Sequence, residues 1–184
     1  MRWLRWLLII AVVVFVIVSR SGERRRARTF EAYNQGMERE AAGEYEQAKA
    51  QFEEAVRLDP DFAEAWTFLG AMHFELDDLQ SARNCYDKAE KLFIEVGNDT
   101  GLAWLLALKS RLSLELGQID EALLFARQAL DISREYDDPR GTSHALSVLA
   151  DVHIELEQYD EALACCTEAL ELDRQYGKIG RAHV

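Results

Sequence analysis

Small and bulky side chains recur along this chain with a long period. Four alanines are spaced 34, 40 and 40 residues apart, and each is followed seven residues later by another alanine. A bulky residue stands three positions before each of the four, and a small one stands twelve before it. The four alanines are Ala48, Ala82, Ala122 and Ala162, the bulky residues are Tyr45, Leu79, Ile119 and Tyr159, and the small residues are Gly36, Gly70, Ser110 and Ala150. Self-similarity at this period indicates a repeat protein.

The pairing of small with large positions has a physical reason. Two antiparallel helices joined by a tight turn approach closely only where small residues occupy their crossing, as with Gly36 facing Ala48. Large residues such as Phe52 then fill the space beside the crossing. One hairpin cannot bury both of its apolar faces, so hairpins stack into a solenoid.

Composition agrees with a helical fold. The 184 residues include only two prolines, and alanine, leucine and glutamate dominate, which favours helices over sheets. We therefore predict an all-α protein. Its main part is a right-handed α-solenoid of about four antiparallel helical hairpins, preceded by an N-terminal hydrophobic helix.

The second unit, AEAWTFLGAMHFELDDLQSARNCYDKA, resembles a tetratricopeptide repeat (TPR) through Trp66, Leu69, Gly70, Ala82, Tyr86 and Ala89. The first unit resembles it through Gly36, Tyr45, Ala48, Phe52, Ala55 and the closing Leu58, Asp59 and Pro60. The third and fourth units are similar to the longer variant of kinesin light chains and spindle-orientation adaptors. Lys109, Ala126 and Cys166 depart from the pattern, so we expect the later helices either to pack more loosely or to lie slightly out of this register.

The predicted domains follow from these units. Residues 1–28 are an anchor with a basic flank, and residues 29–178 are the solenoid, with units near 29–62, 63–99, 100–139 and 140–178. Residues 179–184 have the sequence that one reading frame of a widely used sequencing adapter encodes, so we interpret them as a non-native tail, with a coincidental tail as the alternative.

The N-terminal apolar run permits three interpretations. Residues 6–18 are unbroken apolar sequence, and 13 helical residues span only ~20 Å of a ~30 Å hydrocarbon core. Arg5 and Arg20 can nevertheless snorkel, and Trp3 and Trp6 suit the membrane interface. A cleaved secretory signal lacks an A-x-A site here, and a buried soluble helix is the third interpretation because the run is apolar all round.

The arginines that follow the run favour a retained anchor. Arg24, Arg25, Arg26 and Arg28 resist translocation, so the repeats are predicted to be cytoplasmic. The predicted localisation is a single-pass membrane protein that contacts the lipid bilayer through residues 3–19. A secreted or periplasmic protein after signal cleavage, or an anchor with the repeats outside, is the alternative.

Charge is divided unevenly along the chain. Residues 1–28 hold seven arginines and one glutamate, a net charge of +6, whereas the remainder holds 14 basic and 32 acidic residues, a net charge of −18. An acidic surface repels phosphate backbones, so nucleic acid is not an expected partner.

No constellation of residues indicates catalysis. The cysteines Cys85, Cys165 and Cys166 have no zinc-ligand spacing, and phosphate-binding glycine motifs are absent from the sequence. His73 and His153 occupy positions where packing explains them. We expect no enzyme activity, no cofactor and no metal.

The resemblance implies that the first helix of each hairpin lines a concave, peptide-binding groove. The corresponding positions are Phe30, Tyr33, Asn34, Met37, Glu64, Thr67, Phe68, Trp104, Leu108, Arg111, His144, Ser147 and Asp151. Some of them are expected to be core. Chaperone-binding members of the family hold a terminal carboxylate with cationic and amide side chains, but here only Asn34 and Arg111 are suitable, so such a clamp is disfavoured.

The expected ligand is an apolar or amphipathic helix, or an extended segment with basic residues that meet the acidic rim. The predicted function is a membrane-anchored scaffold that binds partner peptides or helices in this groove. The alternative is a sensory or regulatory arm of a larger signalling enzyme or transcription regulator truncated at its C-terminus.

Overall fold

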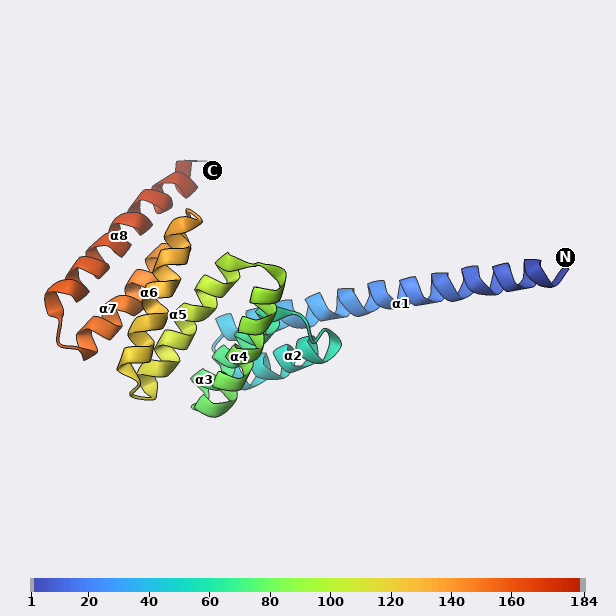
Figure 1. Ribbon diagram of the computed structural model, residues 1–184, viewed down its shortest axis with the longest axis horizontal. Helices are drawn as coiled ribbons and strands as arrows, with labels where there is room; N and C mark the ends of the chain where they lie inside the picture. The colour runs from blue at the N-terminus through green and yellow to red at the C-terminus, as the bar shows by residue number, and fades with distance from the viewer. Residues whose placement is uncertain (1, 183–184) are drawn as a thin grey trace.

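The computed structural model describes the backbone of residues 2–182 and the side chains of residues 22–175. Within residues 2–182 the chain forms eight α-helices and no strand (Figure 1). The helices are α1 (Arg2–Ala41), α2 (Tyr45–Leu58), α3 (Ala63–Glu75), α4 (Leu79–Val96), α5 (Asp99–Glu115), α6 (Ile119–Glu135), α7 (Pro139–Glu155) and α8 (Tyr159–Ala182). The predicted all-helical solenoid is confirmed.

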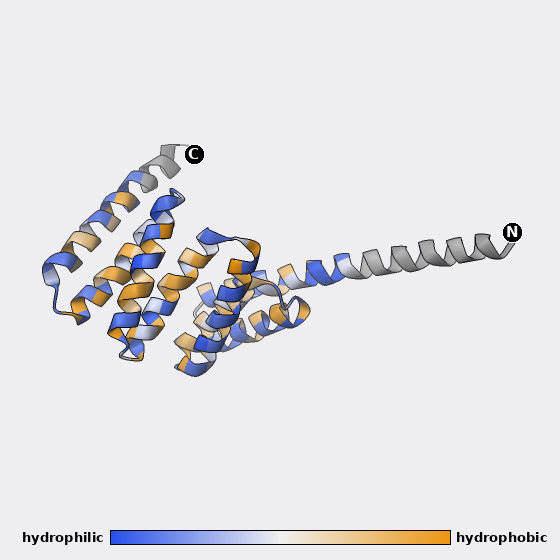
Figure 2. Cartoon of the chain, in the orientation of Figure 1, coloured by the Kyte–Doolittle hydropathy of each residue, from blue (hydrophilic) through white to orange (hydrophobic). Residues whose placement is uncertain are grey.

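Consecutive helices pair into four hairpins, α1 with α2, α3 with α4, α5 with α6, and α7 with α8. Each second helix also packs against the first helix of the next hairpin, and α5 contacts both α3 and α7. The first helices are therefore flanked on several sides. In Figure 2, α5 and α7 are hydrophobic along much of their length, whereas the second helices alternate between hydrophobic and hydrophilic positions.

The repeating alanines lie in the core of the hairpins. Ala48, Ala82 and Ala122 have no exposed surface, and Ala162 on the last helix is 5% exposed. Each lies in the first turns of a second helix, where a larger side chain would hold the two helices apart. This burial is what the spacing of small residues predicted.

In the first two hairpins the glycine of the first helix lies against the residue four places after the repeat alanine. A Cβ added to Gly70 would stand 2.5 Å from the Tyr86 ring, and one added to Gly36 would stand 2.6 Å from the Phe52 ring. In the third hairpin the same two repeat positions hold Ser110 and Ala126 in place of a glycine and an aromatic residue. Ser110 uses its extra atom to donate a hydrogen bond of 2.8 Å to the carbonyl oxygen of Ala122.

The expectation of looser packing in the later helices is wrong for the third hairpin. Ala126 is fully buried, and Ser110 is too. Ser110 is larger than the glycine of the first two hairpins and Ala126 is smaller than their aromatic residue. The two differences offset each other, so the helices of this hairpin remain in close contact.

Lys109 is accommodated by charge. Its Nζ lies 3.0 Å from a carboxylate oxygen of Asp87 and 2.9 Å from one of Glu90, both on α4, and 4.9 Å from the centre of the Phe125 ring on α6. Burial alone would lower the pKa of Lys109, but the hydrogen bonds to Glu90 and Asp87 outweigh it and the pKa is raised. Lys109 therefore stays charged and ties three helices together.

The turn inside each hairpin contains one residue in the left-handed conformation. These residues are Gly43, Asp77, Gly117 and Glu157, each five positions before its alanine. The next N–H then bonds back to a carbonyl oxygen of the first helix, as in the 2.9 Å bond from Asp78 to His73. This geometry ends the first helix and reverses the chain within a few residues.

The predicted localisation is contradicted. No helix in the part of the chain that the structure describes is long and apolar enough to cross a membrane. From residue 22 to Ala41, α1 carries five arginines and four glutamates, and the later helices alternate buried apolar and exposed charged positions, whereas a spanning helix needs about 20 apolar residues.

Two further predictions concern side chains outside the described residues. These are the bilayer contact of residues 3–19 and the tail at residues 179–184. The division into units stays a prediction.

Candidate functional site: the concave groove

The groove positions of the first two hairpins are largely taken up by packing. Tyr33 on α1 has ring centres of Phe62, Phe68 and Phe52 at 5.0, 5.7 and 5.8 Å. Phe68 in turn stacks on Phe52 at 5.5 Å. Burial, with smaller contributions from Glu64 and Glu40, raises the pKa of Tyr33 to about 12, so the hydroxyl stays protonated.

Other predicted residues of these hairpins lie in different surroundings. Thr67 is buried and donates to the carbonyl oxygen of Ala63, so a ligand cannot reach it. Met37 packs against the same core. Half-buried Glu64 accepts a 3.5 Å hydrogen bond from Asn98. Of the predicted set on α1, Phe30, which is 56% exposed, and Asn34 remain open to solvent.

The third and fourth hairpins present a different surface. Trp104 on α5 and His144 on α7 stack with ring centres 4.1 Å apart and planes 19° from parallel. Trp104 remains 41% exposed, so part of its surface is accessible to a ligand. Leu108 packs into the core beside it, and Ser147 is exposed and donates to the carbonyl oxygen of Ser143.

His144 is neutral at neutral pH. Burial, and then the positive charge of Arg111, lower its pKa below the ordinary value of 6.5. Its Nδ1 atom is buried and has no hydrogen-bond partner among the described residues. The ring therefore contributes stacking rather than a positive charge.

Arg111 points along the groove toward the second hairpin. Its guanidinium lies 3.9 Å from a carboxylate oxygen of Glu75 and 5.2 Å from the centre of the Phe74 ring, both on α3. The charge of Arg111 is thus partly engaged by groups of a neighbouring helix.

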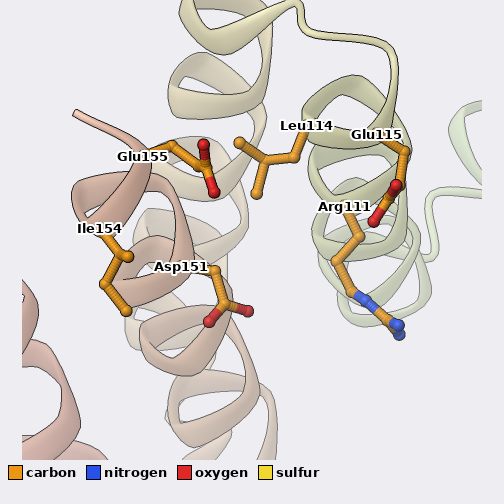
Figure 3. A pocket seen from close by; sticks show the side chains of 6 residues that line it. All are labelled: Arg111, Leu114, Glu115, Asp151, Ile154 and Glu155. Carbon is orange, nitrogen blue, oxygen red and sulfur yellow. The ribbon is translucent and has the colours of Figure 1, made fainter. Parts of the chain in front are cut away.

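A cleft of about 420 Å³ lies between α5 and α7. It is lined by Arg111, Leu114, Glu115, Asp151, Ile154 and Glu155 (Figure 3). The lining thus includes three carboxylates and one guanidinium, and in Figure 3 the Arg111 side chain extends away from Asp151 and Glu155. The pKa of Asp151 is raised because desolvation outweighs the opposing effect of Arg111, so the nearby positive charge does not fully compensate this carboxylate.

Acidic groups extend the surface toward the first hairpin. Glu40 on α1 is half-buried, and burial together with the nearby Glu75 raises its pKa. A raised carboxylate pKa means that the charged form lacks compensation. The groove thus has an excess of negative charge from α1 to α7.

Four cleft residues were missed from the sequence: Leu114, Glu115, Ile154 and Glu155. They lie three and four positions after Arg111 and Asp151, which were predicted. Because residues three and four apart share a helix face, extending that spacing by one turn would have found them.

The described residues offer no group of three or more histidines, cysteines and carboxylates placed to hold a metal ion. Burial, followed by the charges of Asp78 and Glu53, raises the pKa of the Cys85 thiol to about 11, which makes it a poor nucleophile. What the cleft offers chemically is charge, two aliphatic walls and an exposed indole face nearby.

Comparison with known proteins agrees with this architecture. Residues 19–180 match the family model described as the MalT-like TPR region. The heat-shock protein cognate (HSC) co-chaperone sgt12 of Aspergillus fumigatus is 30% identical over 103 residues, which cover 56% of this chain. The chain spans 27% of the length of this curated relative.

Solved structures share the fold at low sequence identity. MamA superposes with a TM-score of 0.61 at 21% identity, covering 82% of this chain and 81% of MamA. Aspartyl phosphate phosphatase F from Bacillus subtilis superposes with a TM-score of 0.70 at 14% identity, covering 91% of this chain and 45% of the phosphatase chain. At these identities the likeness concerns the fold alone.

Proposed function

Because the chain belongs to the MalT-like TPR region family, we propose that it is a scaffold that binds segments of partner proteins in its concave groove. TPR-type helical repeats are suited to protein–protein interaction, since stacked hairpins give an extended concave surface. The similarity of the third and fourth units to the kinesin-light-chain variant stays a prediction.

The observation that carries the proposal is the composition of the cleft between α5 and α7. Glu115, Asp151 and Glu155 supply three carboxylates, whereas Arg111, the cleft's one cation, also lies beside Glu75. A partner with arginine or lysine side chains complements this charge, and its aliphatic stems can lie against Leu114 and Ile154. The ligand we propose is therefore an extended or helical segment that carries basic residues.

A ligand held by its terminal carboxylate fits the groove less well. Phe30, Tyr33, Glu64 and Trp104 stand where chaperone-binding members of the wider family place donors. A negative ligand end would also meet the excess of carboxylates. The co-chaperone activity named for the Aspergillus relative is therefore not extended to this chain.

The proposal describes a binding protein rather than an enzyme. Support comes from the raised pKa of Cys85 and from a histidine, His144, that is stacked and has no carboxylate hydrogen-bonded to it. A histidine acting as a general base normally needs such an orienting partner.

Peptide binding tests the proposal. We would titrate the purified chain into labelled peptides that share one extended apolar sequence and differ only in whether two positions hold arginine, serine or glutamate, following fluorescence anisotropy. The arginine peptide is expected to bind about tenfold or more tightly than the glutamate peptide, with the difference shrinking at high salt. Equal affinities, or tighter binding of the glutamate peptide, would reject a basic ligand.

Matched variants locate the contact. Asp151→Asn with Glu155→Gln removes two cleft charges at nearly constant shape and should weaken the arginine peptide about tenfold. The control, Asp131→Asn with Glu171→Gln, removes the same charges from exposed positions on α6 and α8 and should leave binding unchanged. If both pairs weaken binding alike, only the overall charge matters and the cleft is not the site.

A second candidate is a regulatory arm of a larger signalling protein. The observation that favours it is the coverage of the relatives: the chain accounts for 45% of the phosphatase chain and 27% of the co-chaperone. Reading the genomic sequence beyond residue 178 decides between the candidates. A catalytic domain encoded there supports the regulatory arm, and a stop codon after a capping helix rejects it.

A further inference from the structure

A basic segment lies at the opposite end of the molecule from the acidic cleft. Residues 22–28 of α1 carry Arg24, Arg25, Arg26 and Arg28 against one glutamate, and all four arginines are exposed. Arg28 has an ion pair with Glu54 of α2 at 3.3 Å, an exposed contact of little strength. The exposed arginines of this segment therefore form a basic surface that suits a partner of opposite charge.

We propose that the cleft between α5 and α7 of one copy binds the arginine segment, residues 22–28, of a second copy. This inference rests on the proposed function, because it names the partner of the same groove. The occupant supplies positive charge to a cleft in which three carboxylates outnumber the single cation, Arg111.

The geometry favours a contact between two copies over one within a single copy. α1 packs against α2 in the first hairpin, whereas the cleft belongs to the third and fourth hairpins. In Figure 1 the segment of α1 that precedes α2 leads away from α5 and α7. A second molecule can present its segment to the cleft without any change in the fold.

Side-chain chemistry also fits. Arg24 and Arg28 are four residues apart and share one face of α1, with Arg25 beside them. Guanidinium groups pair with carboxylates through two parallel hydrogen bonds, which suits Asp151 and Glu155. The aliphatic stems of the arginines can cover Leu114 and Ile154, of which Ile154 is 48% exposed.

Such a contact joins two different surfaces. When the cleft of one molecule binds the segment of a second, the segment of the first and the cleft of the second stay free for further copies. The contact is therefore heterologous and leads to open head-to-tail chains unless the rotation closes a ring. Because both surfaces are charged and exposed, association should weaken as salt is added.

Sedimentation of the 184-residue chain over a wide range of concentration tests the proposal. The mean mass of the unmodified protein is expected to rise with concentration at low salt. Arg24→Glu with Arg25→Glu reverses the charge of two positions in the segment, and Asp151→Arg with Glu155→Arg reverses the charge of two positions in the cleft. Each variant alone should associate at least about tenfold more weakly.

Mixing the two reversed variants gives the decisive comparison. Each variant then meets a complementary surface on the other, so the mixture should recover association that neither shows alone. The control, Arg127→Glu with Arg174→Glu, makes the same charge change on exposed positions of α6 and α8 and should associate like the unmodified chain. The N-terminal apolar run is common to all samples, so differences among them report the charged contact.

The results separate this inference from the proposed function. A chain that stays monomeric while the arginine peptide binds overturns the second-copy inference and leaves the proposed function intact. Failure of the peptide to bind overturns both. Association that survives both reversals also overturns the inference and points to the exposed apolar face of α8, where Tyr159, Leu163 and Leu170 are 65%, 67% and 54% exposed.

Discussion

Single residues set how closely the two helices of a hairpin approach. Gly70 lies directly against the ring of Tyr86, which is only 1% exposed and has no room to move away. The same relation holds between Gly36 and Phe52. In the third hairpin the corresponding positions hold Ser110 and Ala126, so both residues differ in size from those of the first two hairpins.

Gly70→Ala tests this matching. A Cβ would fall 2.5 Å from the Tyr86 ring, so overpacking should cost about 3 kcal/mol against a gain of about 1 kcal/mol in helix propensity. We expect a net loss of about 2 kcal/mol in the free energy of unfolding, measured by urea denaturation. In a Tyr86→Ala background the same change should be neutral or stabilising. An identical cost in both backgrounds would show that the ring contact is not the cause.

His144 makes stability depend on pH. Its pKa is lower in the folded state, so on acidification the unfolded chain takes up the proton first. The contribution of the neutral ring is therefore present above the ordinary value of 6.5 and lost as the pH falls through the lowered pKa.

The His144→Gln variant lacks this titration. The stability of the unmodified protein relative to the variant should fall as the pH is lowered from about 7 through the ordinary histidine value of 6.5, as measured by urea denaturation at each pH. Subtracting the variant removes the contributions of Glu40 and Asp151, whose pKa values shift in the opposite direction. A difference that does not change with pH would mean that His144 titrates alike in both states.

The sequence predicted which alanines are buried but not which groove positions are. Alanine at a crossing has one role, because only a small side chain fits there. Tyr33 and Phe68 lie on the flank of a helix face, and such residues turn either to the groove or to the neighbouring helix. That choice depends on Phe52 of α2 and on Phe62, which lies just before α3, so a pattern within one helix does not contain it.

At the scale of helices, the presence of a neighbouring helix determines whether a residue is buried. Leu123 on α6 and Leu163 on α8 both follow their repeat alanine by one position. Leu123 packs against the cluster formed with α7, whereas Leu163 is 67% exposed. The sequence gives the two leucines the same place in the repeat, and only the presence of a following hairpin separates them.

Equivalent substitutions should therefore differ in effect. Leu123→Ser is expected to lower the free energy of unfolding by about 2 kcal/mol, and Leu163→Ser to change it by less than about 0.5 kcal/mol. Thermal or urea unfolding of both variants measures the difference. Equal losses would indicate that α8 is covered in solution.

Helices and hairpins were predictable because their periodicity lies within short stretches of sequence. The turns were less so, since glycine marks the left-handed position at Gly43 and Gly117 but not at Asp77 and Glu157. The role of Lys109 was also hidden, because Asp87 and Glu90 lie on the preceding helix.

For the whole molecule, stability is distributed along the stack. Each hairpin is stabilised by its immediate neighbours, so the inner hairpins are supported on two sides. The last helix, α8, packs against α7 and leaves apolar side chains exposed. The single-pass localisation was wrong because it was judged on a local run of residues, whereas the described helices alternate buried apolar and exposed charged positions.

Hydrogen exchange should reveal this gradient. Amides of α5 and α6 are expected to exchange more slowly than those of α8, because local opening of an end helix exposes fewer contacts. Mass spectrometry of peptides from each helix, at low protein concentration to limit self-association, measures the order. Equal protection of α8 and α6 would show that the stack unfolds as one cooperative unit.

The matched sizes at the helix crossing also limit how such a molecule can be recombined. Joining α3 to α6 would set Gly70 against Ala126 and leave a void, whereas joining α5 to α4 would push Ser110 into Tyr86. A crossover between hairpins keeps each pair together, and one within a hairpin separates it. A gene that lengthens by duplication therefore retains a foldable product when it copies whole hairpins, and libraries of chimeras should be cut at the same boundaries.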